Sequence, residues 1–293
     1  MFPESLGKEF DIFVLGLDKP VPDLTDKAII LPELQARIEA AIEDRVGDKP
    51  FAIAFSGGVD SVTLAFLSSK LGKKFHLCTV GVKGSADILQ AKKVAEHFSW
   101  PITVKELSDD DLEKIFQTIA PIIPSPDVVK LDVGAVVYAV LSVAKEEGYD
   151  LIMTGLGSEE IFAGYERHDH ALQASPQSLH EECWNGLSKL YARDLSRDEA
   201  IAELLKMKAC APLLDTEVIK YAMRIDPSLK IVNEQKKMIF REMAMHAGLP
   251  EEFAQRKKQA AQYGSSVDKA LERIAKKNGC KFKKEYLDQL LKR

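Results

Sequence analysis

The sequence predicts an α/β protein with a doubly wound, mainly parallel sheet and an all-helical C-terminal half. Three observations predict this fold. Strand-like and helix-like segments alternate between about residues 50 and 150, helical patterns alone follow from about Gln177, and a glycine-containing loop directly follows the first buried strand. Alternation of this kind is typical of βαβ units, in which helices cover both faces of a parallel sheet.

Residues 1–49 are predicted to form an N-terminal extension packed on the core. They contain a strand-like run, DIFVLGL, a proline-rich link, and a helical pattern, LPELQARIEAAIEDRVG. Residues 50–293 are predicted to form one synthetase-like domain, with the sheet in about 50–165 and helices in about 166–293. A chain of 293 residues, 46% of them hydrophobic, is long enough to bury such a core.

Four short apolar runs are the predicted strands: FAIAF, KFHLCTV, PITVKEL and DLIMTG. Three helical patterns separate them: SVTLAFLSSKLG, ADILQAKKVAEHF and GAVVYAVLSVAKEEG. The segment APIIPSPD carries three prolines and is predicted to be a rigid connector, because proline lacks the amide proton and blocks the preceding helical turn. The later helical patterns are SLHEECWNGLSKLYARDL, RDEAIAELLKM, TEVIKYAM, NEQKKMIFREMAMHAG and VDKALERIAKKNG.

The first strand runs into the loop SGGVDS. A loop between a parallel strand and the next helix lies at the carboxyl edge of the sheet, where open α/β sheets bind ligands. Gly57 and Gly58 lack side chains, so successive N–H groups can turn toward one anion, and the hydroxyls of Ser56 and Ser61 can add donors. Asp60 would repel a bare phosphate, so its presence predicts a Mg²⁺ between the two charges. The alternative is a tight turn in which Asp60 or Ser61 caps the helix.

A second loop, GLGSEEIFAGY, follows the fourth predicted strand and again combines glycines with acids. Two strand ends would thus bring carboxylates to one crevice, and Asp60 and Glu159 are the predicted magnesium ligands beside the phosphates of ATP. The alternative is that these acids favour the first turn of a helix, and for Glu160 both interpretations stay open.

These stretches resemble a known superfamily. SGGVDS is similar to the signature of the PP-loop ATP pyrophosphatases, which cleave ATP between its α and β phosphates and have an adenine-nucleotide α-hydrolase-like fold. GLGSEEIFAGY resembles the G-x-G-S-D-E-x-F-x-G-Y stretch of the asparagine synthetase synthase domain, which β-lactam synthetases share. The similarity continues in order over about residues 50–265, through VGVKGSADILQAKKVAEHF, SLHEECWNGLSKLYARDLSRDEA, APLLD and KKMIFREMAMHAGLPEEFAQRKKQ.

The resemblance implies an ATP-dependent ligase. Such an enzyme activates a small carboxylate as an acyl-adenylate, releases pyrophosphate, and forms an amide from ammonia or an amine with release of AMP. The implied ATP-binding residues are Ser56, Gly57, Gly58, Asp60, Ser61, Val80, Gly81, Gly155 and Ser158, and the implied metal ligands are Asp60 and Glu159. The implied catalytic residues are Lys258, as a phosphate contact, and Glu181 or Glu182, as the proton acceptor near the adenylate.

Other basic and acidic residues of these segments have simpler interpretations. Lys258 lies in the run RKK, and without the resemblance we would interpret it as a solvated helix end. Glu181 and Glu182 could equally be exposed helical acids. Lys237 and Arg241 are expected on the exposed face of a helix rather than at the phosphates.

Departures from the family pattern limit what the resemblance implies. Phe2 stands where the usual N-terminal glutaminase has its cysteine, so we expect no glutamine hydrolysis here, and the nitrogen would come from free ammonia, an amine or a separate glutaminase subunit.

By ungapped counting, Asp132 falls where the family places an arginine that pairs with the substrate's α-carboxylate, which leaves aspartate as the substrate in doubt. Glu159 replaces the usual aspartate. Cys210 replaces an arginine and is expected to be a buried free cysteine.

Composition excludes several classes of protein. The chain has 40 Lys and Arg residues against 45 Asp and Glu residues, a net charge of −5, which argues against a nucleic-acid partner. The four cysteines lie far apart without a C-x-x-C pair, which argues against a zinc ribbon or disulfide framework and favours a reducing, cytoplasmic location. We expect no export signal and no membrane span. A homodimer is left open.

Two other functions are kept as alternatives. One is a PP-loop enzyme that modifies a nucleotide or a tRNA base, against which stand the acidic composition and the absence of paired cysteines. The other is a nucleotide-binding regulatory subunit or sensor that has lost the chemistry. Asp132 and the missing glutaminase fit that interpretation, whereas the intact loop, the second acid and Lys258 do not.

Overall fold

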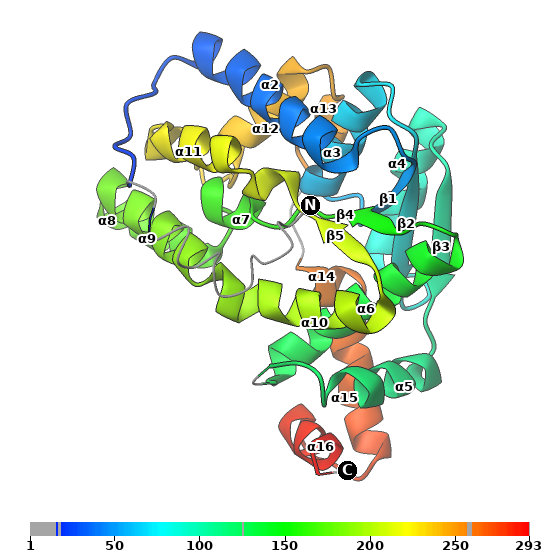
Figure 1. Ribbon diagram of the computed structural model, residues 1–293. Coiled ribbons are helices and arrows are strands. Elements are labelled where there is room, and N and C mark those ends of the chain that lie inside the picture. The colour runs from blue at the N-terminus through cyan, green and yellow to red at the C-terminus, as the bar shows by residue number, and fades with distance from the viewer. Residues whose placement is uncertain (1–15, 17–18, 125, 257–259, 293) are drawn as a thin grey trace.

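The computed structural model describes residues 16, 19–124, 126–256 and 260–292 (Figure 1). The predicted catalytic Lys258 and almost all of the DIFVLGL run lie outside the described residues.

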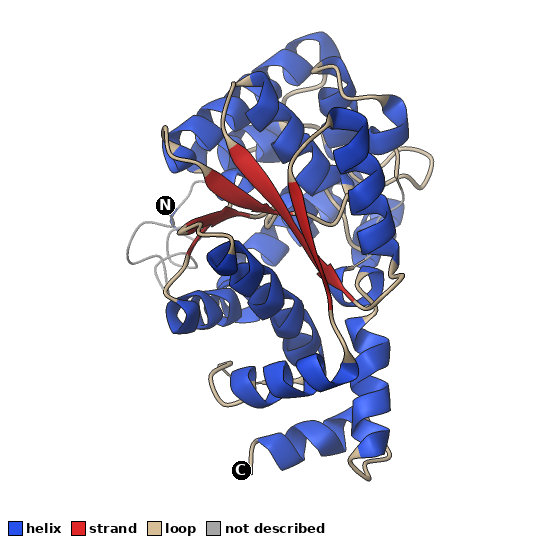
Figure 2. Cartoon of the chain, turned by 90° about the vertical axis from the view of Figure 1, so that its right-hand side faces the viewer, coloured by secondary structure: helices blue, strands red, loops and turns tan. Residues whose placement is uncertain are grey.

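A five-stranded parallel sheet, in the order β3-β2-β1-β4-β5, lies at the centre of the molecule (Figures 1 and 2). The strands are β1 (Phe51–Ala54), β2 (Phe75–Gly81), β3 (Ile102–Glu106), β4 (Leu151–Met153) and β5 (Lys208–Cys210). The chain runs outward from β1 through β2 to β3 and then returns to β4 on the other side of β1. This reversal creates a topological switch point between β1 and β4, and it confirms the doubly wound parallel sheet.

The helices occupy most of the remaining chain. The N-terminal and sheet-associated helices are α2 (Lys27–Val46), α3 (Val59–Lys70), α4 (Ala86–Phe98), α5 (Asp109–Ile119) and α6 (Val128–Glu146). Those that follow β4 are α7 (Ser158–Ile161), α8 (Glu166–Ala174), α9 (Pro176–Ser188), the π-helix η1 (Tyr191–Leu195) and α10 (Ser196–Leu205). After β5 come the 3₁₀ turns η2 (Pro212–Leu214) and η3 (Pro227–Leu229), with α11 (Thr216–Arg224) between them, and then α12 (Met238–His246), α13 (Glu251–Ala254), α14 (Ala261–Gly264), α15 (Val267–Lys277) and α16 (Lys283–Leu290).

The C-terminal half contains one short strand, so the expectation that it is purely helical was wrong in this detail. β5 pairs in parallel with β4, with Ala209 opposite Ile152. Its three residues, Lys-Ala-Cys, carry no strand pattern of their own. They become a strand because the edge of β4 offers them hydrogen-bond partners, which a sequence pattern does not show.

Two hydrophobic clusters cover the two faces of the sheet. Successive residues of β1 point to opposite faces, and Ala52 and Ile53 accordingly belong to different clusters. Helices α2, α3, α11 and α12 contribute to the cluster around Ile53, and helices α5, α6 and α15 to the cluster around Ala52. Figure 2 shows the strands enclosed between these helices. Burial on both faces explains why the strands are apolar runs rather than alternating patterns.

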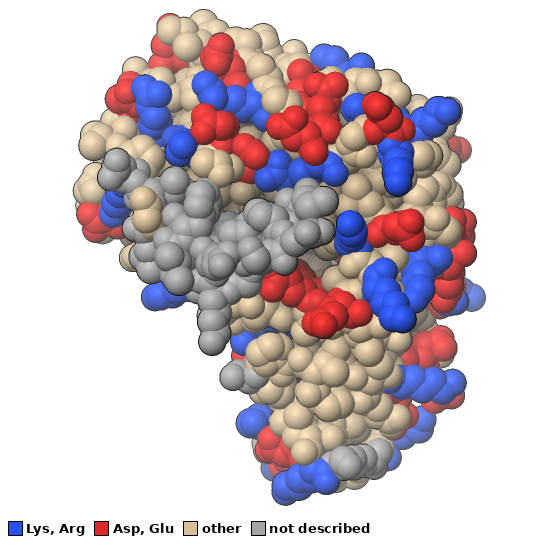
Figure 3. All heavy atoms as spheres, in the orientation of Figure 1, with Lys and Arg blue, Asp and Glu red and all other residues tan. Residues whose placement is uncertain are grey.

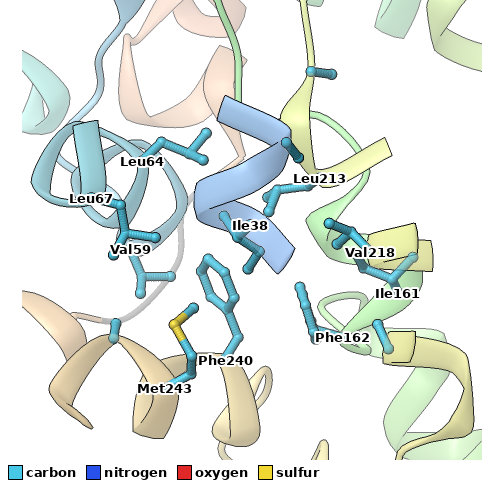
Figure 4. Packing of buried hydrophobic residues seen from close by; sticks show 14 of the residues in the cluster. Ile38, Val59, Leu64, Leu67, Ile161, Phe162, Leu213, Val218, Phe240 and Met243 are labelled. Carbon is cyan, nitrogen blue, oxygen red and sulfur yellow. The ribbon is translucent and has the colours of Figure 1, made fainter. Parts of the chain in front are cut away.

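Helix α2 is part of the core. Its N-cap Asp26 accepts a hydrogen bond from the amide of Ala28 at 2.9 Å, and Ile38 on its inner face is fully buried. Figure 4 shows Ile38 in one packed cluster with Val59 of α3 and Phe240 of α12. A buried isoleucine contributes about 1.5–3 kcal/mol by removal from water. Helix α2 therefore stabilises α3 and α12, two elements that carry site residues.

Substitution of Ile38 tests this packing. Ile38→Ala is expected to lower the free energy of unfolding by about 2–5 kcal/mol, because it removes buried methyl groups and leaves a cavity. Ile29, on the same helix, is 56% exposed, and Ile29→Ala is expected to change the free energy by less than about 0.5 kcal/mol. Urea denaturation of both variants measures the difference, and equal losses would contradict the placement of α2.

Candidate active site

A cavity of about 500 Å³ opens at the carboxyl edge of the sheet, at the switch point between β1 and β4. Its wall includes the predicted site residues Ser56, Asp60, Val80, Gly155 and Glu159. The two loops found in the sequence therefore share one cavity, as expected for neighbouring parallel strands. The remaining predicted ATP-binding residues, Gly57, Gly58, Ser61, Gly81 and Ser158, flank these positions in the chain without lining the cavity.

The loop after β1 is shaped for close backbone approach. Gly57 has φ of +68°, and a Cβ atom there would lie 2.8 Å from Cγ of Gln90 and 3.0 Å from the amide nitrogen of Ala91. The Gly58 amide donates to Oγ of Ser56 at 3.3 Å. Gly58 is also the N-cap of α3, and no side chain caps that helix. Neither Asp60 nor Ser61 therefore acts as the cap that the alternative interpretation required. The amide groups in the first turn of α3 have no side-chain acceptor, as the predicted anion site requires.

Asp60 and Glu159 converge on one point, which the ammonium group of Lys237 occupies. Nζ of Lys237 lies 2.9 and 2.7 Å from the two carboxylate oxygens of Asp60 and 2.9 Å from Oγ of Ser158. It also donates to Oε1 of Glu159. Because one atom contacts both carboxylates, a single cation can reach both of them.

Lys237 and Arg241 are buried, so the expectation that they lie on an exposed helix face was wrong. Lys237 is 1% exposed and Arg241 is 3% exposed. The helix begins only at Met238, and Lys237 precedes it with φ of +58°, so its side chain does not follow the helical periodicity that we assumed. Burial by itself lowers the pKa of Lys237, but the carboxylates of Asp60 and Glu159 outweigh it and raise the pKa, which keeps the side chain charged.

Two glycines make room for this ion cluster. A Cβ atom at Gly155 would lie 2.9 Å from Cβ of Asp60. At Gly164 it would lie 1.6 Å from Oε2 of Glu159 and 2.6 Å from Cε of Lys237. Gly155 and Gly164 are therefore required by the close approach of charged side chains, which the sequence alone did not reveal.

The predicted adenosine side of the cavity contains an unexpected acid. Val80 lines the cavity together with Ala54 and Cys78, and all three present apolar surface. Asp87 of α4 also lines it, and burial raises the pKa of this carboxyl to about 6, although Arg256 partly offsets the rise. Sequence reasoning missed Asp87, because it appeared only as one acid in the first turn of a predicted helix.

Arg256 connects the adenosine side to the loop after β1. Its guanidinium lies 3.3 Å from the carboxylate of Asp87 and donates to the carbonyl of Ser56 at 2.9 Å. Arg256 thus contacts the loop that follows β1.

The far wall of the cavity is apolar on one side and charged on the other. The apolar side comes from α6, through Val129, Val133, Val136, Val137, Val140 and Leu141. On the charged side, Glu160 is 1% exposed and accepts hydrogen bonds from the hydroxyl of Tyr165, at 2.8 Å, and from Arg193 of η1. Burial raises the pKa of Glu160, with Arg193 and Tyr165 opposing the rise. A carboxylate with a raised pKa in a cavity wall is a candidate for proton transfer.

The structure does not bring Glu181 or Glu182 to the cavity wall. Glu181 is exposed and accepts a hydrogen bond from Gln177 at 2.9 Å, and Glu182 pairs with Arg167 at 2.7 Å. Glu181 lies on the outer side of α9, whereas Glu182 is half-buried, and its partner Arg167 lines the cavity. Neither acid lines the cavity itself, and their role near the adenylate stays a prediction.

Asp132 also does not line the cavity, contrary to the position that ungapped counting gave it. It is 2% exposed and lies beside Asp268 of α15, which pairs with Lys283 of α16. Burial, with a further contribution from Asp268, raises the pKa of Asp132 to about 8, whereas Lys283 lowers it. Asp132 was the reason to doubt that aspartate is the substrate. Because Asp132 lies outside the cavity wall, it gives no reason to exclude aspartate.

The geometry of the glycine loop can be tested with a matched pair of variants. Gly57 and Gly72 have almost the same backbone conformation, with φ of +68° and +67°, but a Cβ atom at Gly72 would meet nothing within 4 Å. Both alanine variants should lose about 1 kcal/mol from left-handed backbone strain. Only Gly57→Ala should also weaken ATP binding, by about tenfold or more, as measured by calorimetric titration. Unchanged ATP binding in Gly57→Ala would contradict the predicted position of the nucleotide.

The buried Asp132 gives a pH prediction. The pKa of Asp132 is about 8 in the folded state and about 4 in the unfolded chain. The protonated carboxyl therefore contributes its full stabilisation of the fold below pH 4, and this contribution is lost as the pH rises through 8. At pH 9, Asp132→Asn is therefore expected to raise the free energy of unfolding by about 1–3 kcal/mol over the wild type. The advantage should shrink toward pH 5. Asp110→Asn, at a side chain that is 75% exposed, is the control, and urea denaturation at both pH values is the measurement.

The chain is similar in sequence to a known protein family and to several known proteins. A family model described as asparagine synthase matches residues 33–178 and 169–289. A putative glutamine-hydrolysing asparagine synthetase of Methanocaldococcus jannaschii is 30% identical over 282 residues, which cover 84% of this chain and 51% of that protein. A glutamine-hydrolysing asparagine synthetase of Lotus japonicus is 27% identical over 217 residues, covering 69% of this chain and 36% of that protein. The chain thus spans about half the length, or less, of these curated relatives.

Among solved structures, NMN synthetase from Francisella tularensis is similar with a TM-score of 0.45 at 11% identity, covering 92% of this chain and 94% of that one. The family model, in contrast, extends from within α2 to within α16 and includes both loops of the cavity. On this match, the chain belongs to the asparagine synthase family.

Proposed function

We propose that the chain is an ATP-dependent, amide-forming ligase of the asparagine synthetase type, which produces AMP and pyrophosphate. The observation that carries this proposal is the convergence of Asp60 and Glu159, from the loops after β1 and β4, on one point beside the glycine loop. Family membership supports it, and so do relatives that are named asparagine synthetases.

ATP would bind across the carboxyl edge of the sheet. Its pyrophosphate end would contact the loop after β1, where amide groups at the start of α3 and two hydroxyls provide donors. The residues concerned are Ser56, Gly57, Gly58 and Ser61. The adenosine would lie against Val80 and Gly81, and the α-phosphate beside Gly155 and Ser158. Asp87, which sequence reasoning missed, lies on the adenosine side of the same cavity.

Asp60 and Glu159 fit a magnesium ion. Carboxylate oxygens are ligands that Mg²⁺ prefers, and both carboxylates reach one point. Among the described residues there is no group of three or more His, Cys, Asp or Glu side chains arranged to hold a metal ion. A carboxylate pair completed by phosphate oxygens and water is the usual arrangement for Mg²⁺ bound with a nucleotide. When bound, the ion would neutralise phosphate charge and polarise the α-phosphate.

The chemistry would proceed in two steps. The substrate carboxylate attacks the α-phosphorus of ATP, which forms an acyl-adenylate and releases pyrophosphate. Ammonia or an amine then attacks the acyl carbon, and AMP leaves. The activation is needed because a carboxylate oxygen does not leave at neutral pH, whereas AMP does. Lys258 and Lys237 would offset the charge that builds on pyrophosphate as it separates.

Glu160 is a further candidate, beside Glu181 and Glu182, for accepting the proton of the attacking amine. It lines the cavity, is hydrogen-bonded to Tyr165, and has a pKa that burial raises. The substrate carboxylate would lie between this charged side and the apolar wall of α6. Ammonia, an amine or a separate glutaminase subunit remain the nitrogen sources that we propose.

Figure 3 shows acidic and basic side chains interspersed over one face of the molecule rather than gathered into a basic patch. Within the part of the chain that the structure describes, no helix combines the length and the apolar character that a membrane crossing requires. The cytoplasmic location and the homodimer stay predictions.

Exchange of labelled pyrophosphate into ATP tests the proposal. With Mg²⁺ and the correct carboxylate, the wild type should catalyse exchange, and product analysis after addition of ammonia should show an amide and AMP. Asp60→Asn should lower the exchange rate by about a hundredfold or more, because a metal ligand next to the reacting phosphates is lost. Asp44→Asn, on the exposed side of α2, should leave the rate unchanged.

The common amino acids are the first carboxylates to assay. Exchange with aspartate, followed by asparagine and AMP, would establish an ammonia-dependent asparagine synthetase. If ATP binds but no carboxylate supports exchange, the proposal fails for small acids. A PP-loop enzyme acting on a nucleotide or tRNA, or a nucleotide-binding regulatory subunit, would then be favoured.

A further inference from the structure

The ammonium group of Lys237 fills the position between the two carboxylates of the active site. A lysine ammonium has three protons to donate, and here the acceptors are Asp60, Glu159 and Ser158. The side chain is 1% exposed, so water does not provide these contacts. Lys237 is thus a fully paired, buried cation at the point where a metal ion would bind.

The surrounding backbone holds the lysine in this position. Lys237 has φ of +58°, a conformation that costs a residue with a side chain about 1 kcal/mol or more. Such strain persists only where other interactions compensate for it. Gly164 leaves the space that Cε of Lys237 and the carboxylate of Glu159 occupy together. The fold therefore holds the ammonium of Lys237 between the two carboxylates.

The lysine and a metal ion would compete for the same carboxylates. Both would bind the same oxygens of Asp60 and Glu159, and the ammonium lies only 2.7 Å from one of the Asp60 oxygens. Two like charges this close together in a buried site repel each other strongly, so binding of a metal ion favours displacement of the ammonium. Withdrawal of the ammonium without a new partner would leave a buried, unpaired cation, which costs several kcal/mol. The oxygens of a nucleotide's phosphates can supply that partner.

We propose that Lys237 is an internal counter-ion that keeps divalent cations off Asp60 and Glu159 until ATP binds. It then exchanges the carboxylates for phosphate oxygens, so that the metal ion and the nucleotide enter the site together. The inference rests on the proposed function, because it takes the nucleotide to be ATP and the cation to be Mg²⁺. It assigns Lys237 this role in addition to the contact with pyrophosphate that we propose above.

Binding of Mn²⁺, measured by electron paramagnetic resonance of the free ion, tests the proposal on the full chain. The wild type should bind Mn²⁺ at this site only when an ATP analogue with a methylene bridge between the α and β phosphates is present. Lys237→Met should bind Mn²⁺ without nucleotide about tenfold more tightly than the wild type, or more, because no ammonium group competes with the metal ion for the two carboxylates.

Lys236→Met is the matched control. Lys236 is the neighbouring lysine, but it pairs with Glu166 and Asp169 rather than with the carboxylates of the site. This variant should show the nucleotide dependence of the wild type. The double variant Glu159→Gln with Lys237→Met should lose the nucleotide-independent Mn²⁺ binding, which locates that ion at the carboxylate pair.

Equal Mn²⁺ affinity of the nucleotide-free wild type and Lys237→Met would overturn the proposal. If circular dichroism shows that Lys237→Met is unfolded, Lys237→Gln takes its place, because it keeps a hydrogen-bond donor without the charge. The readout is metal binding rather than catalysis. A lack of pyrophosphate exchange with every carboxylate would therefore contradict the ligase proposal and leave the role of Lys237 to be decided by the Mn²⁺ result.

Discussion

The parallel pairing of β1 with β2 on one side and with β4 on the other is the constraint on which the site depends. Because both neighbours run in the same direction as β1, the loops that follow β1 and β4 emerge at one edge of the sheet. Asp60 and Glu159, which lie 99 residues apart in the chain, therefore meet at a single ammonium group. A different strand order would leave the same two motifs without a common cavity.

The meeting of Asp60, Glu159 and Lys237 sets the net charge of the site. Asp60 and Glu159 bring two negative charges, and Lys237 returns one positive charge, so the cluster keeps a net charge of about −1. The phosphates of ATP would add further negative charge beside it. A divalent ion relieves both repulsions at once, which is the physical reason for expecting ATP and Mg²⁺ together rather than either alone.

The helices of the C-terminal half complete a site that the sheet begins. Lys237 enters from the residue before α12, Arg256 follows α13 and reaches the carbonyl of Ser56, and Gln262 of α14 lines the cavity. On the other face, α6 provides the apolar wall and packs against α15 beside the buried Asp132. The sheet thus positions the end of the cavity where we propose that the phosphates bind. The helices of the C-terminal half determine the charge and the shape of the remaining cavity wall.

The sequence by itself determined four of the five strands, the glycine loop and the two carboxylates. Strand-like runs of buried residues, the glycines after them and the acids at fixed offsets are local features, and local features leave a pattern in the sequence. The family resemblance was also readable, because SGGVDS and GLGSEEIFAGY are continuous stretches.

Only the tertiary structure decided which distant residues join these motifs. It placed Lys237 and Asp87 in the site, removed Glu181, Glu182 and Asp132 from the cavity wall, and made a strand of Lys208–Cys210. The physical reason is the same in each case. The burial of a side chain on a helix depends on where that helix starts and what packs against it, and these are properties of long-range contacts that periodicity within one segment does not contain.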